Sequence, residues 1–156
     1  MEGMISMPIM VKHVSFDDYQ KTQTNYKDAN FLQSAEMAKL QLSRNHIGEV
    51  EALVFERDGL RIGQANVVYR RSFRIFRKAL LFHGPLLDYN SIADLTDLLE
   101  ALILYLKKKN IASLSIHPYL TDLIRNEELE VIEEEKADEV SKVFEKLGFE
   151  QYLDPE

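Results

Sequence analysis

The chain has 156 residues, 46% hydrophobic and 29% charged, with a formal net charge of −7. That length fits one domain with its own core, and the absence of cysteine excludes disulfides and thiol catalysis. The longest apolar stretch, near Leu98 to Leu106, is too short to span a bilayer, and no signal peptide is evident. We therefore expect a soluble, cytoplasmic protein.

Two short helices are predicted at the start of the chain. Ser15 followed by Asp18 resembles a capping box and predicts a helix through about Tyr26. A second short helix is predicted to start at Ser34.

Three strands are predicted next. The segments Val50–Phe55 and Arg61–Tyr69 read as strands joined by Asp58-Gly59, a strong signal for a tight hairpin because both central residues of such a turn need a positive φ. A third strand is predicted at Lys78–His83. It forms a second hairpin with the strand before it, and the basic stretch Arg70–Arg77 is expected at the tip.

The clearest helix is predicted from Ser91 to Lys109, with a serine cap, early acidic residues, late lysines and an apolar stripe at helical spacing. A short strand at Ile111–Ile116 and a last helix at Ala137–Leu147, ended by Gly148, complete the pattern. The acidic stretch Glu127–Glu139 is the segment closest to a disordered loop.

This order of elements predicts the fold class. A meander of antiparallel strands followed by a strand-helix-strand crossover indicates an α/β (α+β) fold with a mixed, mostly antiparallel sheet flanked by helices. One domain over residues 1–156 is expected.

Charge is distributed unevenly along the chain. Residues 126–156 hold 12 acidic and 3 basic side chains, whereas the rest of the chain holds 14 acidic and 16 basic ones. Aromatic residues interleave with the basic stretch, so this hairpin could meet RNA or anionic lipid headgroups. The alternative is a solvated hairpin tip whose charges prevent edge aggregation. The basic residues of this candidate polyanion surface are Arg70, Arg71, Arg74, Arg77 and Lys78.

No self-contained catalytic motif is present, and the four histidines lack metal-ligand spacing, so no metal site is expected. The order of strands and helices is similar to that of GNAT acetyltransferases, which hold coenzyme A on a glycine-rich loop before a helix. The corresponding turn here, His83–Asp88, lacks those glycines, and Pro85 removes an amide donor. Coenzyme A is therefore not expected as a cofactor.

Four segments resemble motifs of the FemABX family, in the family's order and at roughly its spacing. The first is similar to F-x-Q-S-x-x-M/W-A-K, the second to R/K-G-P-V-x-D, the third to R-I-D-P-x and the fourth to L-G-F. They are Phe31–Lys39, Leu81–Tyr89, Ser115–Tyr119 and Leu147–Phe149.

The resemblance implies a function. FemABX proteins look like two tandem GNAT-like domains that transfer an amino acid from aminoacyl-tRNA to the stem peptide of a peptidoglycan precursor. This chain resembles their first domain alone. The resemblance implies a precursor-binding half, inactive by itself, whose partners are a UDP- or lipid-linked muramyl pentapeptide and, in the full enzyme, aminoacyl-tRNA. Because that precursor is lipid-linked, the inner membrane surface is a further expected location.

The resemblance also carries over two site residues. Lys39 matches a family lysine in the precursor cleft near the diphosphate, where a cation is favourable; otherwise it is a solvated lysine on a short helix. His117 stands where the family has an acid before proline and could act as a base; otherwise it makes a hydrogen bond at a strand end. Two other functions remain open: a non-catalytic interaction module with the same fold, and a small-molecule N-acyltransferase that uses an acyl-coenzyme A.

Overall fold

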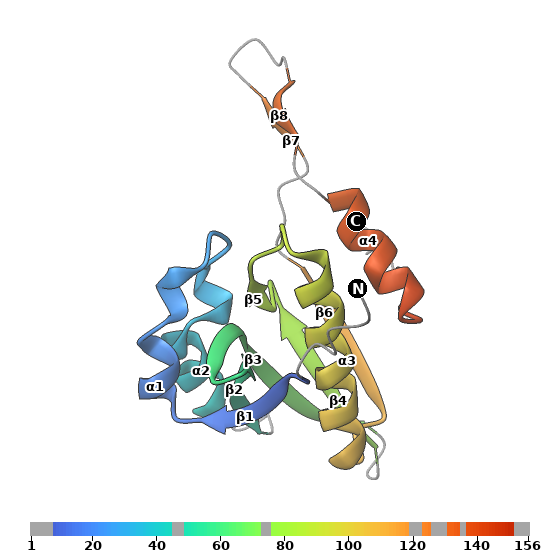
Figure 1. Ribbon diagram of the computed structural model, residues 1–156. Coiled ribbons are helices and arrows are strands. Elements are labelled where there is room, and N and C mark those ends of the chain that lie inside the picture. Colours follow the sequence, from blue (N-terminus) through green and yellow to red (C-terminus); the bar gives the residue numbers. More distant parts are fainter. Residues whose placement is uncertain are drawn as a thin grey trace.

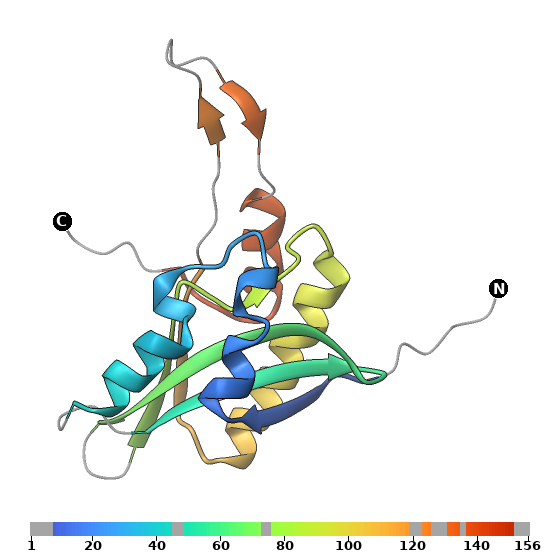
Figure 2. The same ribbon diagram turned by 90° about the vertical axis from the view of Figure 1, so that its left-hand side faces the viewer.

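The computed structural model describes residues 8–44, 49–72, 76–118, 123–125, 131–134 and 137–151. A mixed six-stranded sheet lies between two layers of helices (Figures 1 and 2). Helices α1 (Phe16–Gln20) and α2 (Ala35–Leu42) cover one face of this sheet. Helices α3 (Ile92–Lys108) and α4 (Ala137–Lys146) share a core with the other face. The predicted fold class is confirmed.

The sheet has the order β1-β2-β3-β4-β6, and β5 pairs with β3 beside this path. All its pairings are antiparallel except β4 with β6, which run parallel because the chain crosses over between them through α3. This is the mixed sheet that the sequence predicts. The strands are β1 (Met10–Val14), β2 (Val50–Arg57), β3 (Leu60–Ser72), β4 (Phe76–Phe82), β5 (Leu86–Leu87) and β6 (Ser113–His117).

Local signals in the sequence fix several element ends. The side chains of Ser15, Ser34 and Ser91 each cap a helix by accepting a hydrogen bond from the main-chain amide three residues later. Asp58 and Gly59, with φ of 56° and 76°, make the tight turn between β2 and β3. Three of the predicted helix starts and the first hairpin are therefore confirmed.

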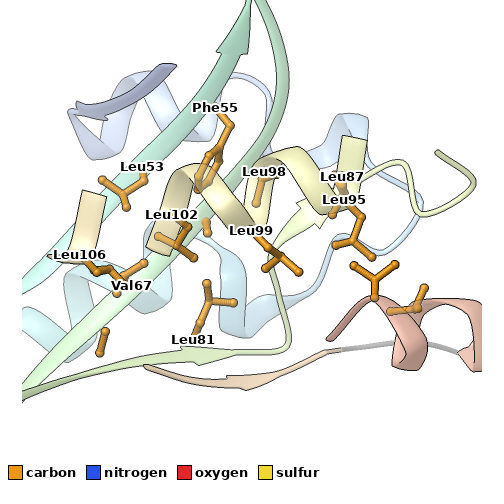
Figure 3. Close-up of a cluster of buried hydrophobic side chains, with 14 of the residues drawn as sticks. Leu53, Phe55, Val67, Leu81, Leu87, Leu95, Leu98, Leu99, Leu102 and Leu106 are labelled. Carbon is orange, nitrogen blue, oxygen red and sulfur yellow. The ribbon is translucent and has the colours of Figure 1, made fainter. Parts of the chain in front are cut away.

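The main core lies between the sheet and α3 (Figure 3). Leucines on one side of α3 pack against alternate side chains of β2, β3 and β4, including Leu53, Phe55 and Leu81. Full burial of one such side chain is worth about 1.5–3 kcal/mol. The buried leucines of α3 are Leu95, Leu98, Leu99, Leu102 and Leu106.

Close packing against this core explains Gly63 on β3. A Cβ atom at this position would lie 2.6 Å from Leu98 Cδ1 and 2.9 Å from the carbonyl oxygen of Leu86. The helix and β5 therefore approach β3 at a distance that only glycine permits.

Several elements differ from the sequence prediction. The helix that starts after Ser15 ends at Gln20, and the chain continues as a 3-10 turn, η1 (Gln23–Asn25). Just after the helix, the hydroxyl of Thr22 donates to Oε1 of Gln64 on β3 at 2.5 Å. The sequence analysis also missed β1 and β5.

The carboxy-terminal region holds a second small sheet. Strands β7 (Leu123–Arg125) and β8 (Val131–Glu134) pair antiparallel and project away from the main sheet in both views (Figures 1 and 2). Part of the acidic stretch expected as a loop is therefore a strand. No helix in the described ranges is long and apolar enough to cross a membrane.

Candidate functional site

The carboxyl ends of β4 and β6 lie side by side, because these two strands are parallel and adjacent. In open α/β sheets, ligands bind where neighbouring parallel strands end. Here β4 is followed by the turn His83-Gly84-Pro85, and β6 ends in His117 before Pro118. This end of the sheet is therefore the candidate site.

A buried glutamine joins two strands at this end. Strands β3 and β4 stay paired only as far as Val68 and Leu80. Two residues further along each strand, the side-chain carboxamide of Gln33 bridges them: its Oε1 accepts from the amide of Asn66 at 2.9 Å, and its Nε2 donates to the carbonyl of Phe82 at 2.6 Å. We call this arrangement the Gln33 bridge. It replaces a ladder hydrogen bond and holds the two strands apart.

The turn after β4 fits closely against the Gln33 bridge. A Cβ atom on Gly84 would lie 2.7 Å from Gln33 Cδ and 2.8 Å from its Oε1, so any side chain at Gly84 would displace the carboxamide. Two of the sequence segments that resemble FemABX motifs therefore meet in space, and the Gln33 carboxamide can keep its position only if residue 84 has no side chain. Gln33 belongs to Phe31–Lys39, and Gly84 to Leu81–Tyr89.

Further hydrogen bonds attach the 3-10 turn η2 (Phe31–Gln33) to the sheet. Asn30 donates through Nδ2 to the carbonyl of His83 at 2.8 Å and accepts the amide of Gln33 through Oδ1. The hydroxyl of Tyr19 donates to the carbonyl of Gln33 at 2.7 Å, and Asn66 donates to the carbonyl of Ser34. Buried polar groups that are satisfied in this way rigidify the structure.

Asp28 and the Oδ1 atom of Asn66 are exceptions near these satisfied groups, because each is buried without a hydrogen-bond partner in the described structure. Neither carboxylate oxygen is exposed to solvent or has a hydrogen-bond partner in the described structure. Burial raises the pKa of Asp28 to about 7. Its charge contributes to raising the pKa of three neighbouring phenols, after burial itself, in Tyr19, Tyr26 and Tyr89. Perturbed carboxylates of this kind are enriched at functional sites.

His117 lies at the carboxyl end of β6 with its side chain exposed. Its ring packs edge-on against Phe82 of β4, with the ring centroids 5.7 Å apart. His117 is thus close to the end of the Gln33 bridge, because Phe82 also supplies the carbonyl that Gln33 binds.

Lys39 lies away from the Gln33 bridge, on helix α2. On α2, Ala35, Ala38 and Gln41 are buried and face inward, whereas Lys39 is exposed. Its ammonium lies 3.3 Å from Asp17 of α1, and both side chains are largely in solvent, at 54% and 85% exposure. No contact described in the structure joins Lys39 to His117.

The basic hairpin differs from the predicted tip. Arg70 and Arg71 lie in β3, and Arg77 and Lys78 lie in β4, whereas Arg74 lies outside the described residues. Arg71 pairs with Arg77 and Arg70 with Lys78, so successive pairs point to opposite faces of the sheet.

One of these cations already has partners. Arg77 forms an ion pair with Glu49, and its guanidinium lies 5.0 Å from the ring centroid of Tyr69. Arg70 and Arg71 are exposed. The basic residues thus form a two-faced ribbon in place of a single charged tip.

A second buried carboxylate, that of Glu51, lies next to the carboxyl end of α3. Glu51 of β2 accepts hydrogen bonds from Tyr69 at 2.6 Å, from Tyr105 at 3.0 Å and from Lys109 at 2.7 Å. Burial raises its pKa, but the bonds from Lys109 and Tyr69 outweigh this and hold the pKa of Glu51 below its usual value. Because this carboxylate is fully satisfied, we assign it to stability: it ties the last turn of α3 to the sheet.

Sequence reasoning singled out three pieces of this end of the sheet and missed three others. It picked out the segments that hold Gln33 and Gly84 and the strand end at His117. It gave no role to Asp28, Asn30 or Asn66, because each is a polar residue in a loop or strand without a local pattern. The one available signal was Asn30, directly before a short helical turn, a position where Asn commonly caps.

Comparison with known proteins adds to this geometry. A sequence model described as the FemAB family matches residues 12–152. A search of curated protein sequences gave no significant match.

Solved structures share the fold at low sequence identity. FemX superposes with a TM-score of 0.67 and 16% identity over 90% of this chain, which spans 32% of the FemX chain. An aminoglycoside acetyltransferase from an uncultured soil metagenomic sample gives a TM-score of 0.56 and 11% identity, over 95% of this chain and 94% of its own. A ribosomal-protein-alanine N-acetyltransferase from Brucella melitensis biovar Abortus 2308 gives 0.56 and 10%, over 96% of each chain.

Proposed function

The chain belongs to the FemAB family, and from this we propose that it is the precursor-binding part of a tRNA-dependent aminoacyltransferase of peptidoglycan cross-bridge synthesis. Its reaction would be acyl transfer from an aminoacyl ester to an amine of the stem peptide, promoted by positioning of the two substrates. The observation that carries the proposal is the fit of Gly84 against the Gln33 bridge. This fit ties two family-like segments into one unit at the end of β4.

Lys39 is proposed as the cation for the precursor's diphosphate. Its pair with Asp17 does not oppose this role, because an ion pair between two exposed side chains is worth only about 0–1 kcal/mol. The ammonium can therefore leave Asp17 for a ligand at little cost. A diphosphate would offer it a stronger, charge-assisted hydrogen bond.

Binding of UDP-linked muramyl pentapeptide, measured by calorimetry, tests this role. Replacing Lys39 by Ala removes a hydrogen bond to a charged group, so we expect binding to weaken by about 1.5–3 kcal/mol, roughly 10- to 150-fold. Lys107→Ala is the matched control, since Lys107 is also exposed but lies at the end of α3. If Lys39→Ala binds as tightly as the control, Lys39 is not in the site.

His117 is proposed as the group that accepts a proton from the attacking amine. An imidazole is a good base near neutral pH, and this one lies exposed at the carboxyl end of β6 beside Phe82. NMR spectra of the same titration test its place: the His117 ring resonances should shift when the pentapeptide is added. If they stay fixed while other resonances move, His117 lies outside the site.

The chain alone is proposed to be inactive in transfer. It spans about a third of the FemX chain. The acyl donor would then need surfaces that the remaining two thirds of such a protein supplies. Incubation with charged tRNA and lipid-linked precursor should give no labelled product, and product formation would contradict this part of the proposal. No coenzyme A is proposed, because Gly84 in the turn after β4 packs against the carboxamide of the Gln33 bridge.

The basic ribbon is proposed to contact anionic lipid headgroups at the inner membrane face. Arg70 and Arg71 are exposed in β3, whereas Arg77 is held by Glu49 and Tyr69. Screening confines each field to about 8–10 Å, so the negative net charge of the chain does not prevent local attraction.

Sedimentation with vesicles tests this membrane role. Wild type should bind anionic vesicles more than neutral ones, and less as salt rises. Replacing Arg70 and Arg71 by Ser should abolish binding, whereas Lys107→Ser should not. Binding to tRNA but not to vesicles would reject the lipid assignment.

A further inference from the structure

The loop between η1 and η2 passes next to the candidate site. Its 26–30 segment alternates in exposure: Lys27 and Ala29 are exposed, whereas Tyr26, Asp28 and Asn30 are half-buried. The amide of Ala29 donates to the carbonyl of Tyr26 at 3.1 Å, which makes this segment a turn. Every second side chain of a surface turn is therefore partly withdrawn from solvent.

The side chain of Asn30 links this segment to the turn after β4. Its Nδ2 donates both to the carbonyl of Asp28, at 3.0 Å, and to the carbonyl of His83, at 2.8 Å. Its Oδ1 accepts the amide of Gln33, the residue that bridges β3 and β4. The position of the 26–30 segment is therefore coupled to the candidate site through Asn30.

Three phenols lie close enough to the Asp28 carboxylate for its charge to raise their pKa, although burial raises the pKa of each one more. They are those of Tyr19 on α1, Tyr26 and Tyr89. The hydroxyls of Tyr19 and Tyr89 each donate to a main-chain carbonyl, at 2.7 Å and 2.6 Å. Because a phenol has a single proton to donate, neither of these two can stabilise a charge on Asp28.

Among the described residues, no cation contributes to the pKa of Asp28. Burial raises this pKa to about 7, and the residue's own main-chain amide lowers it only in part. Burial also raises the pKa of Tyr26, and Arg61 of β3 lowers it in part, but Arg61 is not among the groups that change the pKa of Asp28. A charged carboxylate with both oxygens buried and unpaired costs much more free energy than the protonated form.

The 26–30 segment is the part of the structure that can release this carboxylate to solvent. It contains no helix or strand, and segments of that kind open locally at low cost. Since Asp28 belongs to the segment, loss of its proton favours an outward movement of the segment itself. Asn30 moves with it, so its bonds to His83 and Gln33 break in the same step.

We propose that the 26–30 segment is a pH-dependent latch on the candidate site, closed while Asp28 is protonated and opened when Asp28 loses its proton. In the closed state Asn30 holds the turn after β4 and the Gln33 bridge together. In the open state Asp28 is hydrated, Asn30 releases both, and the end of β4 is free to move.

The direction of the pH effect follows from proton linkage. The closed state keeps a proton that the open state loses at the ordinary carboxyl pKa of 3.8. Opening therefore becomes more favourable as pH rises from 3.8 to about 7, and it levels off above that value.

Hydrogen exchange measured by NMR on the 156-residue chain tests the latch. The reporting amides are those of Ala29, which bonds within the segment, and Gln33, which bonds to Asn30. After correction for the intrinsic effect of pH on exchange, their protection should fall roughly 5- to 30-fold between pH 4 and pH 8, a range that allows for solvent near this half-buried carboxyl. Low urea should leave it unchanged, because local opening exposes little surface.

Three variants separate the latch from other effects. Asp28→Asn has no carboxylate, so the protection of both amides should be the same at the two pH values. Asp58→Asn, the matched control in the exposed β2–β3 turn, should keep the wild-type pH dependence. Asn30→Ala removes the bond to His83 and should lose protection already at pH 4.

The proposal is overturned if protection in wild type does not change with pH, or if it changes equally in Asp28→Asn. A pH-dependent loss that grows in low urea also overturns it, because Asp28 then acts only on global unfolding. Wild-type protection of Asn30→Ala at pH 4 does the same, because Asn30 then does not hold the segment.

Discussion

Replacing Asp28 by Asn should stabilise the protein, and the gain should depend on pH. Neither carboxylate oxygen of Asp28 has a partner among the described residues, and burial raises its pKa from 3.8 to about 7. The folded state therefore holds a proton that the unfolded state has already lost between those two values. Stability falls as pH rises through this window and stays low above it. Asn is neutral at every pH and escapes this penalty.

The size of the effect follows from the pKa. At about 1.36 kcal/mol for each tenfold change, the rise to about 7 corresponds to ~4 kcal/mol of destabilisation at alkaline pH. Although both carboxylate oxygens are buried, the residue as a whole is only half-buried, and we expect nearby solvent to reduce that figure to ~1–2 kcal/mol. We expect Asp28→Asn to raise the free energy of unfolding by this amount near pH 8 and by almost nothing near pH 4.

Urea unfolding at several pH values, followed by circular dichroism, measures this difference. Asp58→Asn is the control, because Asp58 is exposed and its left-handed turn position, with φ of 56°, suits Asn equally well. Its difference from wild type should not change with pH. The reasoning fails if Asp28→Asn lowers stability near pH 8, or if its gain is the same at all pH values.

Three further substitutions test other parts of the structure, each by chemical unfolding. Glu51→Gln should destabilise by about 1–3 kcal/mol near neutral pH, because Lys109 loses its buried partner. Since the pKa of Glu51 is lowered, this difference should be present above its usual 4.5 and disappear as the pH falls below it; a constant difference would contradict the ion-pair role. Gln33→Glu removes the donor to Phe82 and should cost about 2–4 kcal/mol, more than Gln41→Glu in the neighbouring helix, and equal costs would argue against the bridge. Gly63→Ala should cost about 1–3 kcal/mol because the new methyl meets Leu98, whereas a neutral result would show that α3 can shift.

The elements that could be predicted from sequence are those with strong local signals. The long helix α3 combines a serine cap, a leucine stripe and terminal lysines, and the structure confirms it within one residue at each end. The β2–β3 hairpin follows from Asp58-Gly59 in the same way. Both depend on side chains close together in sequence, which is the information that periodicity and turn chemistry carry.

The elements that could not be predicted depend on distant partners. Strand β1 is extended because it pairs with β2, which is distant in sequence. Strand β5 has only two residues, too few for any periodic pattern. The site shows the same limit. Gln33 and Asn66 are polar residues that become buried only when the 3-10 turn η2 packs on β3. Lys39, His117 and the basic ribbon remain predictions for the site.

The Gln33 bridge has a consequence for how the chain folds during its synthesis. Gln33 leaves the ribosome 49 residues before Phe82, the carbonyl that it must bind. At about 5–20 residues per second, its carboxamide stays hydrated for roughly 2–10 s with no strand to join. The segment from α1 to α2 therefore cannot dock in its final place until β4 has been made. A nascent chain arrested before Phe82 should present this whole amino-terminal segment to chaperones and proteases, and one arrested well after it should not.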